Sequence, residues 1–185
     1  MTSPASPQRI RQEHRVIEVV LTGLERIADA AERERAVDRA KADRALEILR
    51  NFADRCHHAK EEQHLFKAME GRGMSHQSGP IAVMLQEHDL GRSHVRAMLE
   101  AVPAASTGDA AAVGNFSQHA REYVGLLRQH ISKEDKVLYP MAEQLLTDAD
   151  DRRLVEAFEV VEREEMGEGA HEKYHTWARE LAEER

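Results

Sequence analysis

Residues 56–66, CHHAKEEQHLF, decide the fold and the chemistry that we expect of this chain. On a helix, side chains four positions apart project from one face about one turn apart, so His57 and Glu61 can share a metal ion. A second segment, QHISKEDKVLY, repeats this spacing with His130 and Glu134. Two helices that face each other with these pairs could hold two metal ions between them.

The composition of the chain indicates an all-α protein. Only 4% of its 185 residues are aromatic and 32% are charged, and β-branched runs are few, which favours helices over strands. The length is sufficient for one domain with a substantial core. Four long amphipathic helices with modest loops predict an up-down-up-down antiparallel four-helix bundle. We expect these helices over residues 8–31, 38–71, 80–102 and 109–145.

Beyond the bundle, the sequence predicts a helical extension. We expect a disordered or extended N-terminus at 1–9, the bundle over 10–146, and additional C-terminal helices over 147–185 that pack on the bundle.

Several residues mark the expected helix ends. Asp38 and Asp109 stand where side chains commonly cap the first turn of a helix. Gly71 is expected to end the second helix, and Pro103 to break the chain after the third.

Charge and hydropathy exclude several classes of partner. The formal net charge is −8 and no Lys/Arg cluster is interleaved with aromatic residues, so we expect neither nucleic acid nor an anionic membrane as a partner. No apolar run approaches the roughly 20 residues of a membrane span, and the first residues lack the apolar core of a signal peptide. We therefore expect a cytoplasmic protein, either a monomer or a homodimer. Its single cysteine, Cys56, excludes a cysteine-based zinc cluster.

Histidines interrupt the apolar rows of the predicted helices. His14 shares an inward row with Ile10, and His88 interrupts the apolar stripe of the third helix. Burying four imidazoles and two carboxylates without partners would cost several kcal/mol per group, against a total stability of roughly 5–15 kcal/mol. Metal coordination removes this conflict. Imidazole and carboxylate without thiolate favour iron or manganese, with zinc chemically possible, and Glu61 and Glu134 are the natural bridging ligands.

Three segments, HHAKEEQHLF, GPIAVMLQEHD and QHISKEDKVLYPM, resemble those of the hemerythrin-like, or HHE cation-binding, domains over roughly residues 10–146. Two HxxxE motifs flank an EHD motif in the order of that family, with an isolated histidine in the first helix. The resemblance implies a non-haem di-iron centre in an antiparallel four-helix bundle. By motif position it also implies six ligands: His14, His57, Glu61, His88, His130 and Glu134. It does not include His58 among them.

One ligand position departs from the family pattern. Classical oxygen-carrying hemerythrins use five histidines and two carboxylates, with HxxxH on the third helix, whereas Met84 and Arg92 stand four residues from His88. The vacant position could be open to water or a small ligand, or be closed by another side chain. Our first choice is His171, which a short terminal helix could fold back over an open end of the bundle. The alternatives on the chain are His175, Tyr123 and His119.

The remaining candidates receive structural interpretations. His58 should face away from His57 by about 100° and lie at the surface or between helices. His64 is expected to line the pocket without ligating, and His76 and His94 to face solvent. Cys56 is expected to be a buried structural thiol rather than a redox-active one.

The expected function follows from the metal site. It is a non-haem di-iron centre that binds or reacts with a small oxidant, namely dioxygen, nitric oxide or hydrogen peroxide, in oxygen or redox stress handling or sensing. The sequence leaves turnover open. The alternatives are a non-enzymatic iron store or redox-signalling module, and a helical interaction module with vestigial histidines.

Overall fold

The computed structural model describes residues 5–167 and 170–183, and the chain forms helices and no strand in these ranges. The first rod is α1 (Ala5–Glu34). The second runs without interruption from α2 (Arg39–Ile48) through η1 (Leu49–His58) and η2 (Glu61–Leu65) to α3 (Phe66–Glu70). The third is α4 (Gly79–Ala105), and the fourth joins α5 (Ala110–Lys133), η3 (Glu134–Leu138) and α6 (Tyr139–Leu145).

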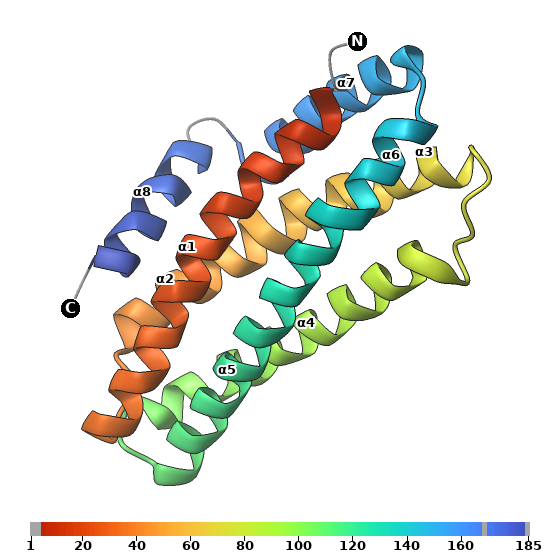
Figure 1. The fold of residues 1–185 in the computed structure, drawn as a ribbon. Coiled ribbons are helices and arrows are strands. Elements are labelled where there is room, and N and C mark those ends of the chain that lie inside the picture. Colours follow the sequence, from red (N-terminus) through yellow and green to blue (C-terminus); the bar gives the residue numbers. More distant parts are fainter. Residues whose placement is uncertain (1–4, 168–169, 184–185) are drawn as a thin grey trace.

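Successive rods pack against each other, and the fourth packs against the first, which closes the ring of four helices. Each rod reverses the direction of the one before it (Figure 1). The structure thus confirms the predicted up-down-up-down bundle. Among the described helices, none is long and apolar enough to cross a membrane.

The helix ends follow the sequence signals with one exception. The side chains of Asp38 and Asp109 accept hydrogen bonds from the backbone N–H groups two to three residues into their helices, and Gly71 caps the second rod. Pro103, however, lies inside α4 and does not end it. Ala105 is buried and its carbonyl accepts a hydrogen bond from Val37, which holds the last turn in place.

The N-terminal prediction needs a correction, because α1 already begins at Ala5 within the segment expected to be extended or disordered. The carboxylate of Asp151 accepts hydrogen bonds from the backbone N–H groups of Ala5 and Ser6 at 3.0 and 2.9 Å. It therefore satisfies donors that a helix start leaves unpaired. This contact across the fold is not visible as a local sequence signal.

Two further helices cover the bundle on the side of α1 and the second rod (Figure 1). α7 (Asp148–Glu165) begins at a capping box formed by Thr147 and Asp150. α8 (Ala170–Glu183) packs on α1 and α2. The approach of α8 requires Gly23, because a Cβ there would lie 2.9 Å from that of Leu181.

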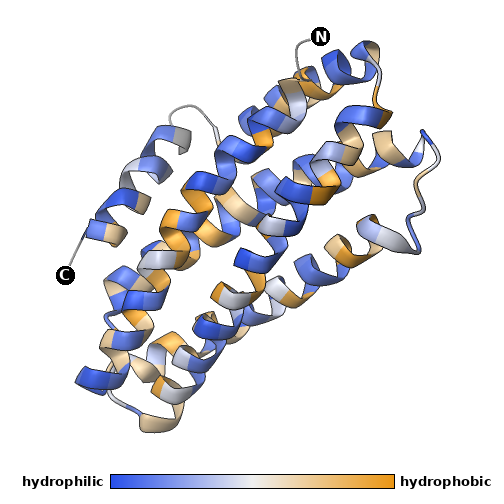
Figure 2. Ribbon diagram, viewed as in Figure 1, coloured by the Kyte–Doolittle hydropathy of each residue, from blue (hydrophilic) through white to orange (hydrophobic). Residues whose placement is uncertain are grey.

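The apolar core is divided into two clusters along the bundle. Apolar and polar residues alternate along every rod (Figure 2), and the buried apolar ones gather on either side of a band of ionisable side chains. On the first rod, for example, Ile10 belongs to one cluster and Ile17 to the other, with His14 between them. The fold therefore places the predicted site residues in the middle of the bundle.

Candidate metal centre

Seven ionisable side chains from all four rods converge in this band, and none is more than 4% exposed. They comprise five imidazoles and two carboxylates: His14, His57, His58, Glu61, His88, His130 and Glu134. Six of the seven candidate site residues of the sequence analysis are among them.

The seven side chains form two adjacent groups. In each group, one potential ligand atom per residue lies within 4.8 Å of the others. The larger group contains His58, Glu61, His88 and His130, and the smaller contains His14, His57 and Glu134. Each group is thus compact enough to hold a metal ion.

The two carboxylates connect the groups. Glu134 places Oε1 3.0 Å from Nε2 of His130 and Oε2 3.1 Å from Nε2 of His14. Oε2 of Glu61 lies 3.6 Å from Nε2 of His57 and 3.5 Å from Nε2 of His88. Each carboxylate thus reaches a histidine of either group, as a bridging ligand must.

A carboxylate stands behind each of the five imidazoles. Each ring can donate its Nδ1–H outward, which fixes the ring and leaves Nε2 directed at the centre. The pairs, with their N···O distances, are His14–Asp135 at 3.0 Å, His57–Glu13 at 2.9 Å, His88–Glu62 at 2.7 Å, His130–Glu87 at 2.9 Å and His58–Asp54 at 3.4 Å.

Burial and the neighbouring carboxylates shift the pKa values of these histidines in opposite directions. Burial lowers the pKa of His57 to about 4, although the hydrogen bond that its Nδ1–H donates to Glu13 acts in the opposite direction. Burial also opposes protonation of His14 and His130, but the carboxylates beside them outweigh it and raise both pKa values to about 9. These two imidazoles therefore hold protons beside the carboxylate of Glu134. A bound cation would displace them, so metal binding should release protons.

Several buried atoms at the centre lack a hydrogen-bond partner. They are Nε2 of His58, Oε2 of Glu61 and both carboxylate oxygens of Glu134. Imidazole nitrogens lie 3.0–3.6 Å from these oxygens without forming a hydrogen bond to them. Unsatisfied buried polar atoms are costly. The residues present therefore fit a metal ion.

The sequence analysis placed His58 at the surface or between helices and left it out of the candidate ligands; it lies between helices, beside the other donors and not at the surface. It is 4% exposed, and its ring stacks on that of His88 with centroids 3.8 Å apart. The reason is local: η1 and η2 are π-helical, with i→i+5 hydrogen bonds in place of i→i+4. The wider turn rotates each residue by less than the 100° of an α-helix, so neighbouring His57 and His58 both point inward.

Three of the candidates for the vacant position, His175, Tyr123 and His119, belong to neither of these two groups in the described part of the chain. The side chain of His171, the first choice, lies outside the described residues. His175 is exposed and contacts the ring of Phe52. Tyr123 lines a surface pocket. His119 contacts His94. His94 is buried, whereas the sequence analysis expected it to face solvent.

Tyr139 is a site residue that the sequence analysis missed. Its fully buried hydroxyl donates a hydrogen bond to Oε1 of Glu61 at 2.7 Å and lies 3.2 Å from Nε2 of His14. The sequence could have indicated it, because Tyr139 lies about one turn after Glu134 and on the same inward face of the helix.

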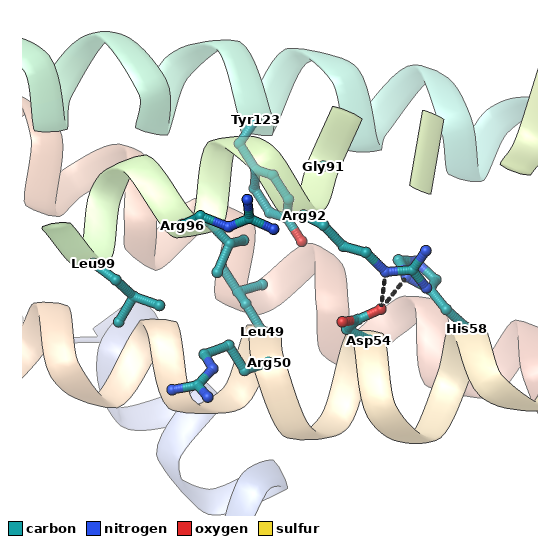
Figure 3. Close-up of a pocket in the computed structure, with 10 residues that line it drawn as sticks. Leu49, Arg50, Asp54, His58, Gly91, Arg92, Arg96, Leu99 and Tyr123 are labelled. Atoms are coloured by element: carbon teal, nitrogen blue, oxygen red, sulfur yellow. Dashed lines mark hydrogen bonds and ion pairs between the residues drawn. The ribbon is translucent and has the colours of Figure 1, made fainter. Parts of the chain in front are cut away.

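A pocket of about 370 Å³ leads from the surface toward His58 between the second and third rods. Figure 3 shows Arg92 and Asp54 next to His58, with Arg50 and Arg96 further along. Arg92 pairs with Asp54 at 2.8 Å and with Glu62 at 2.7 Å. The position four residues after His88 thus holds an ion pair behind the centre.

Four antiparallel helices around buried, linked imidazole and carboxylate groups define a helical cation-binding protein. The family model of the hemerythrin HHE cation binding domain matches residues 6–142, and the chain belongs to this family. Uncharacterized proteins of Mycobacterium bovis and of two Mycobacterium tuberculosis strains are 26% identical to it over 166 residues. The match covers 88% of this chain but only 63% of each relative. No solved structure matches the chain.

Proposed function

We propose that the chain binds two iron ions and that the reduced centre binds or reacts with a small oxidant: dioxygen, nitric oxide or hydrogen peroxide. The observation that carries the proposal is the pair of buried donor groups linked by Glu61 and Glu134. Nitrogen and oxygen donors with shared carboxylates favour iron or manganese, with zinc as a competitor.

His58 changes the expected ligand set. In this proposal His58, His88 and His130 would hold one ion and His14 and His57 the other, with Glu61 and Glu134 available to both. Five imidazoles and two carboxylates equal the set of classical oxygen-carrying hemerythrins. A histidine of the second rod would then take the place of the one that the third rod lacks.

Bound iron would supply the electrons and the coordination position that an oxidant needs. The chain supplies the rest. Tyr139 lies on the side of the centre with two histidines and holds a proton between Glu61 and His14. Burial and the neighbouring carboxylates raise its pKa well above the ordinary value, so it stays protonated and can donate a hydrogen bond to a bound ligand.

The pocket beside His58 is the proposed entrance. Its lining includes three arginines, Arg50, Arg92 and Arg96, and a single carboxylate, that of Asp54. This excess of positive charge favours small anions and polar molecules over cations.

A second candidate function, a redox sensor, is favoured by one connection between the centre and α7. The buried ammonium of Lys60 contacts Glu13, the partner of His57, and also Glu162 of α7 at 2.6 Å. A change of charge at the centre would therefore act on α7 as well.

Anaerobic iron loading followed by metal quantification tests the proposal. We expect two iron ions per chain, and a visible spectrum that responds to reduction, azide and peroxide. His57→Ala and His58→Ala should lose this response, whereas His76→Ala, at an exposed histidine, should keep it. Peroxide or nitric oxide turnover that His57→Ala abolishes would identify an enzyme, and reversible binding without turnover a carrier or sensor. Protein that binds no iron would contradict both.

A further inference from the structure

A second group of potential ligands lies outside the buried centre, on α4 and α5. It consists of His94, His119 and Glu122. His94 is 8% exposed, whereas the side chains of His119 and Glu122 are 30% and 46% exposed. The group therefore has a buried floor and an open side. None of its residues contributes to the centre described above.

The three donor atoms form a nearly regular triangle. Nδ1 of His94 and Nδ1 of His119 are 3.0 Å apart, and Oε2 of Glu122 lies 3.6 and 3.7 Å from them. Ligands at about 2.0–2.1 Å from a tetrahedral zinc ion are about 3.4 Å apart. The three atoms thus stand close to three corners of such a tetrahedron.

The orientation of Glu122 supports this arrangement. Gln118, one turn earlier on α5, donates a hydrogen bond from Nε2 to Oε1 of Glu122 at 3.0 Å. The other carboxylate oxygen is then free to face both imidazoles. A hydrogen bond that holds a ligand in place from outside is a common feature of metal sites.

A hydrogen bond between two neutral imidazoles is the simpler interpretation of the contact between His94 and His119. It would satisfy one nitrogen of each ring. It does not explain why a carboxylate oxygen, held by Gln118, lies at nearly equal distances from both nitrogens. A cation among the three atoms explains all three distances.

We propose that His94, His119 and Glu122 bind a divalent transition-metal ion of the zinc class, with the fourth position open to water. Two histidines and one glutamate are an established ligand set for zinc with an open position. Because the ligands come from α4 and α5, the ion would clamp these two helices together. The site is independent of the iron centre and does not require the proposed oxidant chemistry.

The test uses protein whose buried centre has first been loaded with iron. Zn²⁺ is then titrated, and bound zinc and retained iron are both quantified after desalting. We expect one zinc ion per chain in addition to the iron. His119→Ala and Glu122→Gln should weaken zinc binding roughly tenfold or more, with unchanged iron content. Both positions are partly exposed, so folding should tolerate the changes, and circular dichroism verifies this. His76→Ala serves as the matched histidine control.

Co²⁺ provides an independent readout, because tetrahedral coordination gives it an intense visible absorption. We expect this absorption in the wild-type protein and its loss in His119→Ala. Three results would overturn the proposal: no zinc uptake beyond the iron, equal uptake by His119→Ala, or uptake matched by an equal loss of iron, which would assign the zinc to the buried centre.

Discussion

The imidazole rings of His58 and His88 stack with their centroids 3.8 Å apart. In the proposed ligand set, His58 of the second rod takes the place of the histidine that the third rod lacks. We predict that His58→Ala lowers the iron content from two ions per chain toward one, because the larger group loses one of its three imidazoles. Metal quantification after anaerobic loading measures this. His64→Ala, at a partly exposed histidine on the same rod, is the control. Two ions retained by His58→Ala would contradict the assignment.

Glu13→Gln should weaken metal binding by roughly 10- to 100-fold, because Glu13 orients His57 and increases its basicity. The same change removes one of the two counter-charges of buried Lys60. Loss of a buried charge partner costs roughly 3 kcal/mol, and we expect the free energy of unfolding of the metal-free protein to fall by about that amount.

Urea denaturation measures the loss of stability, and competition with a chelator measures the loss of affinity. Glu18→Gln is the matched control, because this residue lies on the same helix and makes only a long surface ion pair, with Arg128 at 3.6 Å. Equal effects of the two substitutions would argue against a special role of Glu13.

The substitution Arg96→Glu reverses one charge in the lining of the pocket. It should slow azide binding to the oxidised iron centre several-fold at low salt, because the entrance attracts anions less strongly. The difference should shrink as ionic strength rises. Stopped-flow spectroscopy measures the rate. Arg15→Glu, at an exposed position of α1, controls for the change in net charge. An unchanged rate in Arg96→Glu would place the entrance elsewhere.

Cys56 should be unreactive in the folded protein. Burial raises the pKa of its thiol to about 12, so the reactive thiolate is scarce at neutral pH. We expect no alkylation by iodoacetamide at pH 8 over a period in which the urea-unfolded chain is labelled completely. Mass spectrometry measures the alkylation of the native and of the unfolded protein. Labelling of the native protein at the unfolded rate would show an accessible thiol and reopen a redox role.

Asp150 should stabilise the protein in a pH-dependent manner. Hydrogen bonds from the Thr147 side chain and backbone, together with Arg153 and Arg72, hold its pKa well below the ordinary 3.8. The folded state therefore binds the proton less well than the unfolded state. The contribution of Asp150 is complete above pH 3.8 and is lost as the pH falls below it.

We expect Asp150→Asn to lower the melting temperature by a constant amount between pH 5 and 7, and the difference from wild type to shrink below about pH 4. Asp148→Asn, at an exposed residue of the same turn, should have little effect throughout. A difference that does not change with pH would assign the effect of Asp150 to shape instead of charge.

The sequence predicted the bundle well because its signals were local. Amphipathic rows, the Asp38 and Asp109 caps and the HxxxE spacing each depend on residues within one or two turns. His57, Glu61, His130 and their partners meet in the core because an apolar row must face inward, whatever it contains.

What the sequence did not show depends on contacts between distant segments or on backbone geometry. His58 points inward because η1 is π-helical, and no residue pattern marks that change. His94 is buried because it meets His119 of α5, and α1 starts early because Asp151 caps it. The sequence analysis treated the carboxylates behind the histidines only as charged residues. Each carboxylate lies on the same helix as its histidine or on a neighbouring one, at no constant separation along the chain, so no motif revealed the pairs.

The buried ammonium of Lys60 indicates how long a fragment must be to keep the charges around the centre intact. It is 1% exposed and held between Glu13 and Glu162. The family match ends at residue 142, but a fragment that ends there would lack Glu162 and leave this buried charge with one carboxylate in place of two. The smallest fragment that keeps both carboxylates on Lys60 must therefore extend into α7 as far as Glu162, beyond the last residue of the family match.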